Sequence, residues 1–383
     1  MNESILAPNR RSFLKTAGLL SLGLLAQPAG LTAWGAPAKA AVPIRGVNLG
    51  GWLVLEKWIK PTLFTGLKAE DEYSFCQELG TAAAARLQHH RETWITDEDF
   101  AWLAAHGINS VRLPVGYWVA EENPPFVSGL ETMTQAFKSA KRHGLSVLLD
   151  LHGAPGSQNG WDHSGRQGSL GWHTSPENIS HTIKVLENLA AWCRDQDNLL
   201  GIELINEPKD EIPQAVLQDF YRRGYEAIRK QLPADRAAVV FHDSFRPLIW
   251  DKCLSGAAHA NVLLDTHLYQ CFSPEDNRRD INEQLVAAGS GRTEQLLKMQ
   301  AHHACIVGEW SLGLPPKTME GLTAFTCDEA MRAYAATQLL SYERTRGWYF
   351  WTYRTEEKGG WNFRAGVERG WFPAHFAPPA EKA

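Results

Sequence analysis

The chain has 383 residues, 44% of them hydrophobic and 21% charged, which allows a large folded core and excludes wholesale disorder. The formal net charge is −5 at pH 7 and the sequence has no basic patch, so nucleic acid is not an expected partner. The six cysteines form no C-x-x-C pair and no zinc-ligand spacing. We therefore expect neither a metal nor a cofactor.

The N-terminus has the features of an export signal. Arg10 and Arg11 precede a weakly apolar stretch over 17–26, and small residues then lead into 36–40. This order is typical of a twin-arginine signal that is cleaved near residue 38 or 40. The apolar run is too short to span a bilayer. We predict a signal peptide over 1–40, a catalytic domain over 41–383, no membrane anchor after cleavage, and a bacterial protein that is periplasmic or secreted.

Strand-like and helix-like segments alternate along the rest of the chain. Eight short apolar runs suit buried parallel strands, at 45–49, 110–115, 146–151, 200–205, 238–241, 262–268, 304–307 and 348–351. Amphipathic helices are expected at 97–106, 133–143, 176–194, 213–232, 282–302 and 328–345. The alternation predicts an α/β protein with a (β/α)8 TIM barrel in a single domain. A doubly wound open sheet is the alternative, but no glycine-rich phosphate turn follows the first strand.

Two long loops interrupt this alternation. The first, over 56–94, separates the first strand from its helix and contains a helical stretch at 78–91, and the second covers 153–172. Both follow strands, so we expect both to lie at the C-terminal face of the barrel, where the active sites of this fold are built.

Two glutamates lie at the ends of strand-like runs a hundred residues apart. Glu207 belongs to LINEP at 204–208, and Glu309 belongs to GEW at 308–310. A barrel could bring these carboxylates face to face, which is the arrangement that glycoside hydrolysis needs. For a retaining enzyme we expect the carboxyl groups ~5–5.5 Å apart.

The other predicted strand ends also carry residues suited to this chemistry, namely Arg112, His152, Asn206, His267, Tyr269 and Trp351. We expect Arg112 to keep Glu309 ionised, and we expect burial and the neighbouring carboxylate to raise the pKa of Glu207. Asn206 can bind the 2-hydroxyl of a sugar, and Tyr269 can hold Glu309. The two histidines can orient hydroxyl groups or the acid, and Trp351 offers an apolar face to a sugar ring.

The order of these residues resembles glycoside hydrolase family 5, and more closely its exo-β-1,3-glucanase subgroup. The strings that carry the resemblance are RGVNLGGWLVLE at 45–56, DLHGAPGSQNG at 150–160, GYW at 116–118, GWYFWT at 347–352, WNF at 361–363 and GW at 370–371. The similarity extends over roughly 44–373. It implies a retaining (β/α)8 enzyme in which Glu207 is the acid/base and Glu309 is the nucleophile.

The resemblance also implies roles in sugar binding. Glu56 corresponds to a carboxylate that grips the terminal glucose. Trp161 and Phe272 fall where the subgroup has an aromatic pair that clamps the next sugar. The subgroup usually has Asn, a contact of the terminal glucose, at the position of His163.

These features together predict a monomeric β-glycosidase that acts on β-glucan or β-glucosides and releases glucose from non-reducing ends. An endo-β-glucanase and a transglycosylase are alternatives, because all of them form the same covalent intermediate. A non-catalytic carbohydrate-binding barrel would be expected to lack one of the glutamates. A metal-dependent hydrolase is disfavoured, because the adjacent pairs His89-His90 and His302-His303 point in different directions on helices.

Overall fold

The computed structural model describes residues 42–376, which form a closed barrel of eight parallel strands. The strands are β1 (Ile44–Asn48), β2 (Ser110–Gly116), β3 (Ser146–Gly153), β4 (Leu199–Glu203), β5 (Ala238–His242), β6 (Val262–Leu268), β7 (Ala304–Trp310) and β8 (Gly347–Phe350). Each strand pairs with the next in sequence, and β8 pairs with β1 to close the barrel. The predicted (β/α)8 fold is confirmed and the open sheet is excluded. The predicted signal segment, 1–40, lies outside the described residues.

The strands are apolar along nearly their whole length because both faces of the sheet are covered. Every residue of β2, β5, β6 and β8 is buried. A small inner cluster that includes Leu148, Val240, Ile306 and Tyr349 fills one part of the barrel interior. Gly46 leaves room for this filling, since a Cβ there would lie 2.1 Å from the ring of Tyr349. The larger core cluster joins the strands to the surrounding helices.

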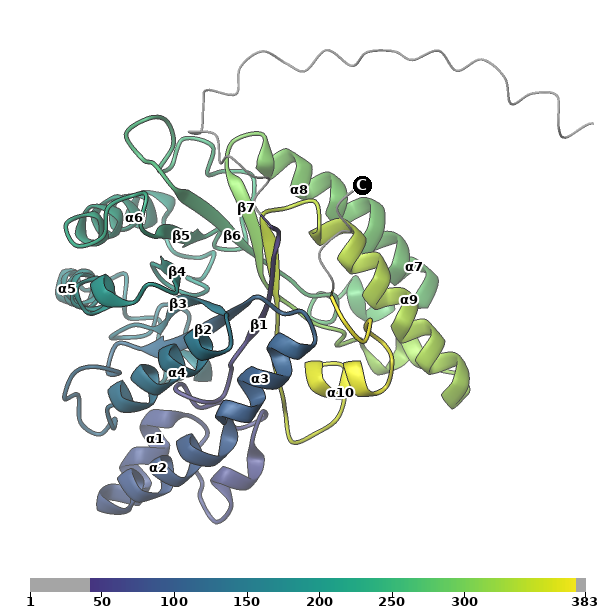
Figure 1. The fold of residues 1–383 in the computed structure, drawn as a ribbon, viewed down its shortest axis with the longest axis horizontal. Helices are drawn as coiled ribbons and strands as arrows, with labels where there is room; N and C mark the ends of the chain where they lie inside the picture. The colour runs from purple at the N-terminus through teal and green to yellow at the C-terminus, as the bar shows by residue number, and fades with distance from the viewer. Residues whose placement is uncertain (1–41, 377–383) are drawn as a thin grey trace, which may run out of the picture. The chain divides into compact units, whose positions relative to one another are not determined.

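Helices surround the strands, with α5 and α6 on one side and α7, α8 and α9 on the other (Figure 1). The helices are α1 (Glu72–Leu79), α2 (Ala83–Trp94), α3 (Asp97–Ala105), α4 (Leu130–Arg142), α5 (Pro176–Trp192), α6 (Gln214–Arg229), α7 (Ile281–Val286), α8 (Arg292–Gln300), α9 (Ala324–Tyr342) and α10 (Phe363–Glu368). None of those within 42–376 is long and apolar enough to cross a bilayer.

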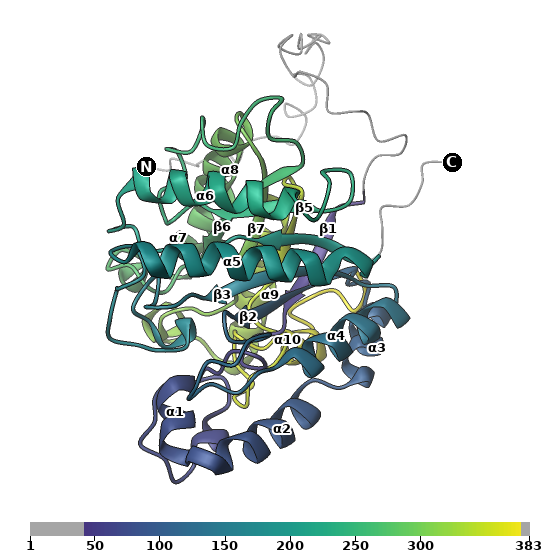
Figure 2. The same ribbon diagram turned by 90° about the vertical axis from the view of Figure 1, so that its left-hand side faces the viewer.

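Two predicted helices differ from the structure. The segment 282–302 is divided into α7, a π-helical turn at Ala287–Gly291 and α8, in keeping with the low helix propensity of the two glycines in that turn. The stretch at 78–91 belongs to two helices, α1 and α2, because the chain turns at Gly80 with a positive φ of 53°. Both of these helices lie at one edge of the barrel (Figure 2).

The strand ends shift slightly from their predicted places, and these shifts decide how the candidate residues are held. β4 ends at Glu203, so Asn206 and Glu207 lie on the loop that follows it. β3 continues to Gly153, which places His152 within the strand. β8 ends at Phe350, and Trp351 is the next residue. All of these residues still gather at the C-terminal face of the barrel.

Candidate active site

A pocket of about 1250 Å³ lies at the C-terminal face of the barrel. The predicted site residues that line it are Glu56, His152, Trp161, His163, Glu207, His267, Tyr269, Phe272, Glu309 and Trp351. The two other predicted residues, Arg112 and Asn206, are completely buried and contact pocket residues instead. The barrel therefore brings all twelve residues into one site.

Glu207 is held by two imidazoles. Its Oε1 atom lies 2.6 Å from Nδ1 of His267, and its Oε2 atom lies 3.5 Å from Nε2 of His163. The backbone of Glu207 has a φ of 42°, a left-handed conformation that is uncommon for a non-glycine residue. Such a conformation persists only where the surroundings impose it, and it is found most often at functional sites.

Glu309 is held by a cation and a phenol. Arg112 Nη1 lies 3.0 Å from Oε1 of Glu309, and the hydroxyl of Tyr269 donates a hydrogen bond of 2.7 Å to Oε2. The predicted partnerships of Glu309 with Arg112 and Tyr269 both occur. Nδ1 of His267 lies 3.4 Å from the same Oε2 atom, so one imidazole nitrogen faces both glutamates.

The two glutamates are close enough for a retaining mechanism. Because His267 Nδ1 lies 2.6 Å from Glu207 and 3.4 Å from Glu309, the two oxygens concerned are at most about 6 Å apart. Retaining glycosidases hold their carboxyl groups ~5–5.5 Å apart, whereas inverting enzymes need ~6.5–9.5 Å.

The predicted pKa directions of the two glutamates were wrong. Burial alone would raise the pKa of Glu207, but the hydrogen bond from His267 and the nearby imidazoles of His267 and His163 lower it to about 2. Burial, helped by the charge of Glu207, raises the pKa of Glu309 to about 7 although His267 also lies near it. At neutral pH the carboxyl group of Glu207 is therefore ionised, and that of Glu309 is protonated in part of the molecules.

Arg112 explains why Glu309 is not kept fully ionised. Its guanidinium also contacts Glu203 at 2.8 Å and Asp150 at 3.1 Å, and it donates to the side-chain oxygens of Asn206 and Asn48. The single guanidinium thus contacts three carboxyl groups, of which Glu309 is only one. The sequence argument assumed that Arg112 serves Glu309 alone, because it did not include the acids inside β3 and β4.

His152 stands between this network and the pocket. Its Nδ1 lies 2.6 Å from Asp150, and burial lowers its pKa well below the usual value, so its imidazole is neutral. The ring stacks on Trp351 with centroids 5.4 Å apart and planes 5° from parallel. Asn206 Nδ2 lies 3.4 Å from its Nε2. His152 and Trp351 therefore support each other at the pocket wall.

Glu56 is a further buried acid of the pocket lining. Burial first, and then the charges of Asp162 and the two central glutamates, raise its pKa well above the usual value. Trp58 Nε1 donates to Oε2 of Glu56 at 2.9 Å, while Oε1 has no hydrogen-bond partner among the described residues. A buried oxygen of this kind can bind a hydroxyl group of a ligand.

Aromatic side chains are exposed at the pocket. Trp161 packs edge-on against Phe245, and Phe272, which is 70% exposed, lies near Tyr269 and Trp361. Trp161 and Phe272 thus line the same pocket from separate aromatic groups. The sequence prediction missed Trp58, Phe245 and Trp361, since an aromatic residue in a loop has no local signal that distinguishes a pocket wall from ordinary packing.

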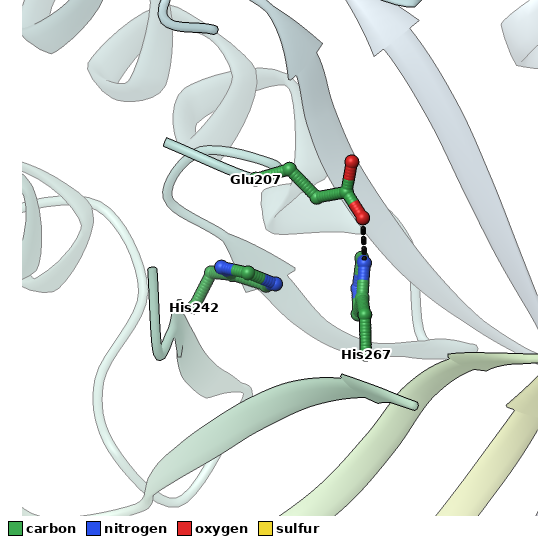
Figure 3. Close-up of side chains that lie close together, drawn as sticks. All are labelled: Glu207, His242 and His267. Carbon is green, nitrogen blue, oxygen red and sulfur yellow. Dashed lines mark hydrogen bonds and ion pairs between the residues drawn. The ribbon is translucent and has the colours of Figure 1, made fainter. Parts of the chain in front are cut away.

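Two histidines lie near Glu207, and together the three side chains have the composition of a possible metal site. One ligand-type atom each of Glu207, His242 and His267 lies within 4.8 Å of the others, and Figure 3 shows these side chains facing one another. However, Nδ1 of His242 accepts a hydrogen bond from the N–H of Ser244. Nε2 of the neutral ring must then carry the hydrogen and cannot ligate a metal. His242 therefore does not offer a ligand atom to an ion in this trio.

Comparison with known proteins agrees with this geometry. The family model described as Cellulase (glycosyl hydrolase family 5) matches residues 75–357. A protein of Emericella nidulans named "Probable glucan 1,3-beta-glucosidase A" is 38% identical over 377 residues, covering 88% of this chain and 91% of that protein. A "Glucan 1,3-beta-glucosidase" of Blumeria graminis is 36% identical over 380 residues and covers 86% of each.

The fold is also similar to solved structures. The crystal structure of a rutinosidase from Aspergillus niger has a TM-score of 0.74 at 21% identity, covering 87% of this chain and 98% of that one. The crystal structure of AoRut has a TM-score of 0.75 at 22% identity, covering 87% and 97%. At this level of identity the likeness concerns the barrel fold.

Proposed function

We propose that this chain, which belongs to glycosyl hydrolase family 5 and is a glycoside hydrolase, removes glucose from the non-reducing ends of β-1,3-glucan or short β-glucosides. The observation that carries the proposal is the pair of buried carboxyl groups, Glu207 and Glu309, that face one nitrogen of His267 at the base of the pocket. The names of the 38% and 36% identical relatives support the choice of glucan.

In the first half of the reaction, Glu309 attacks the anomeric carbon and Glu207 gives a proton to the leaving oxygen. The attack forms a glycosyl ester with Glu309 and breaks the glycosidic bond. Arg112 and the hydroxyl of Tyr269 hold the attacking carboxylate at a fixed angle. Asn206, which the guanidinium of Arg112 also fixes, is placed to bind the 2-hydroxyl.

The first step requires the proton on Glu207, whereas the pKa order in the free enzyme favours Glu309. The positive charge that develops at the anomeric carbon favours an ionised Glu309, and exclusion of water by the sugar favours a neutral Glu207. We therefore propose that substrate binding moves the proton. His267 Nδ1 faces both carboxyl groups and provides a route between them.

In the second half, ionised Glu207 takes a proton from water, which attacks the anomeric carbon and frees Glu309. The low pKa of Glu207 in the free enzyme suits the ionised form that this step needs. The sugar then leaves with its original anomeric configuration, since the carbon has been inverted twice.

Sugar recognition is assigned to the pocket wall. Glu56, with a free buried oxygen, is placed to bind hydroxyl groups of the terminal glucose, and His163 lies beside Glu207 on the same wall. Trp161 and Phe272 expose aromatic faces where the next sugar would lie. Aromatic faces pack against the C–H surfaces of sugar rings.

The test is the product pattern from a laminarin-type glucan. We expect glucose from the first time point, released as the β-anomer when followed by proton NMR. A ladder of oligosaccharides would favour endo action, and products longer than the substrate would favour transglycosylation. Initial release of the α-anomer would contradict the retaining mechanism. No products with any β-glucan or β-glucoside would favour a non-catalytic carbohydrate-binding barrel.

We further propose that residues 1–40 direct export by the twin-arginine route, in a bacterium, and that 41–383 form a monomeric mature enzyme without an anchor. The support is the motif at Arg10 and Arg11 and the small residues at 36–40. The relatives named above come from fungi, so they do not bear on this route. A reporter fused after residue 45 should reach the bacterial periplasm, and replacement of both arginines by lysine should retain it inside the cell.

A further inference from the structure

A layer of acids lies beneath the two central glutamates. Asp150 of β3, Glu203 of β4 and Asp265 of β6 are all completely buried. With Glu207 and Glu309 they make five carboxyl groups in one region of the barrel. If all five were ionised, the charge would greatly exceed what the neighbouring cations could balance.

Among residues 42–376, the cations that contact this group are Arg112 and His267. His163 lies near Glu207 at the pocket wall, and the other nearby imidazoles, His152 and His242, have pKa values well below the usual one because of burial. Uncompensated charges in a space without solvent are too costly for a folded protein to keep. At least one of the deeper carboxyl groups therefore holds a proton.

Two unpaired oxygens point to its location. Glu203 Oε2 accepts a hydrogen bond of 2.8 Å from Arg112 Nε, but its Oε1 has no hydrogen-bond partner among the described residues. Oδ1 of Asp265 accepts the N–H of Gly308 at 2.6 Å, but its Oδ2 also has no hydrogen-bond partner. One ligand-type atom each of Glu203, Asp265 and His267 lies within 4.8 Å of the others. A proton on Glu203 would supply a donor to this group of acceptors, in which Oδ2 of Asp265 also lies 3.5 Å from Nε2 of His267.

The surroundings indicate which acid carries the proton. Burial, together with the charges of Asp150 and Asp265, raises the pKa of Glu203 well above its usual value in spite of Arg112. Asp265 accepts a hydrogen bond from a backbone N–H and lies 3.5 Å from Nε2 of His267. Gly308 leaves the space that the side chain of Asp265 occupies, because a Cβ at Gly308 would lie 1.8 Å from Oδ2 of Asp265.

We propose that Glu203 is a neutral carboxylic acid in the folded enzyme, that it donates its proton to Asp265, and that Asp265 keeps His267 charged. Glu203 and Asp265 are then positioning residues that act through His267, which faces both Glu207 and Glu309. Among the described residues, the titratable groups around His267 are Asp265, Glu203, Glu207, Glu309 and His242. The role of the charged His267 in catalysis rests on the proposed function, whereas the assignment of a proton to Glu203 does not depend on that function.

Two isosteric changes in the full chain form a matched pair, Glu203→Gln and Asp265→Asn. Both residues are completely buried and each change turns a carboxyl group into an amide. We expect Glu203→Gln to keep the melting temperature within about 2 °C, because an amide N–H replaces an O–H at the same place. If Glu203 is instead the ionised partner of Arg112, the loss of a buried ion pair should lower the melting temperature by about 6–10 °C.

For Asp265→Asn we expect kcat/KM to fall at least about tenfold and the alkaline limb of its pH profile to move about one unit or more lower, since His267 loses its proton more easily. An unchanged profile would contradict the role of Asp265. Infrared spectra at pD 8 supply a readout that needs no activity. The wild type should show a protonated-carboxyl band that Glu203→Gln lacks.

The infrared and melting results remain decisive if Asp265→Asn fails to fold. A protonated-carboxyl absorption of equal intensity in the wild type and Glu203→Gln would overturn the proposal, and so would a stoichiometric metal ion in the purified protein that Glu203→Gln releases. If the wild type hydrolyses no glucan while these two results are as expected, the proposed function fails and the proton assignment stands.

Discussion

At the scale of single residues, the site depends on how Glu207 and Glu309 divide one proton. The sequence places a carboxyl group on each of two strand ends, and the burial of both makes the neighbours decide which one is charged. His267 favours the ionised form of Glu207, and its shorter distance to that residue explains why. The backbone of Glu207 is in the left-handed region, with a φ of 42°, and its carboxyl group contacts the imidazole of His267.

Replacing Glu309 by Gln should remove the nucleophile while keeping the shape of the site. We expect kcat on an aryl β-glucoside to fall on the order of 10³-fold or more. Steady-state kinetics on variant protein purified free of wild type would measure this. Retention of more than a few per cent of kcat would contradict the assignment of Glu309 as nucleophile.

Replacing Glu207 by Ala should affect substrates unequally. A substrate with a good leaving group needs little help from an acid, so its bond cleavage should be slowed much less than that of a glucan. The ratio of kcat/KM values for an activated aryl glucoside and laminaritriose would show the difference. Equal losses on both would contradict an acid role for Glu207.

At the scale of elements, the loop that follows β3 is tied to the loop that follows β4. Gln158 is completely buried, and its side-chain amide donates to the carbonyl groups of His152 and Asn206 while accepting the N–H of Ala154. Asn159 adds a hydrogen bond of 3.2 Å to the carbonyl of Glu207. The pocket wall and the proposed acid/base are therefore positioned by one set of bonds.

Gln158→Ala should loosen this connection. It leaves buried backbone groups without partners, and we expect it to lower the free energy of unfolding by about 2–4 kcal/mol and to lower kcat as well. Urea unfolding and kinetics would measure both effects. Gln88→Ala, an exposed change on α2, serves as the control and should be nearly neutral. Wild-type stability for Gln158→Ala would show that the loop is held by other contacts.

At the scale of the whole molecule, the barrel brings together groups from strands across the entire chain, and the catalytic arrangement affects stability. Because the folded pKa of Glu309 is about 7, above its usual 4.5, folding favours the protonated form. This contribution is fully present below the unfolded pKa and is lost as the pH rises through about 7. At alkaline pH the ionised Glu309 therefore lowers the stability of the folded protein relative to its stability at acid pH.

Glu309→Gln should consequently be more stable than the wild type at pH 8, although it is inactive. The difference in melting temperature should grow between about pH 4.5 and 7 and then level off, since Gln does not ionise. Scanning calorimetry of both proteins across this range would test it. A constant difference at all pH values would mean that Glu309 has an ordinary pKa in the folded protein.

The sequence by itself determined the barrel, because buried parallel strands need continuous apolar runs and most of these runs are followed by an amphipathic helix that covers them. It also determined which residue types lie at the strand ends, including Glu207, Glu309 and Arg112. The tertiary structure alone decided their charges. Those depend on Glu203, Asp150 and other side chains that are distant in sequence, and on burial, which no local pattern of residues expresses.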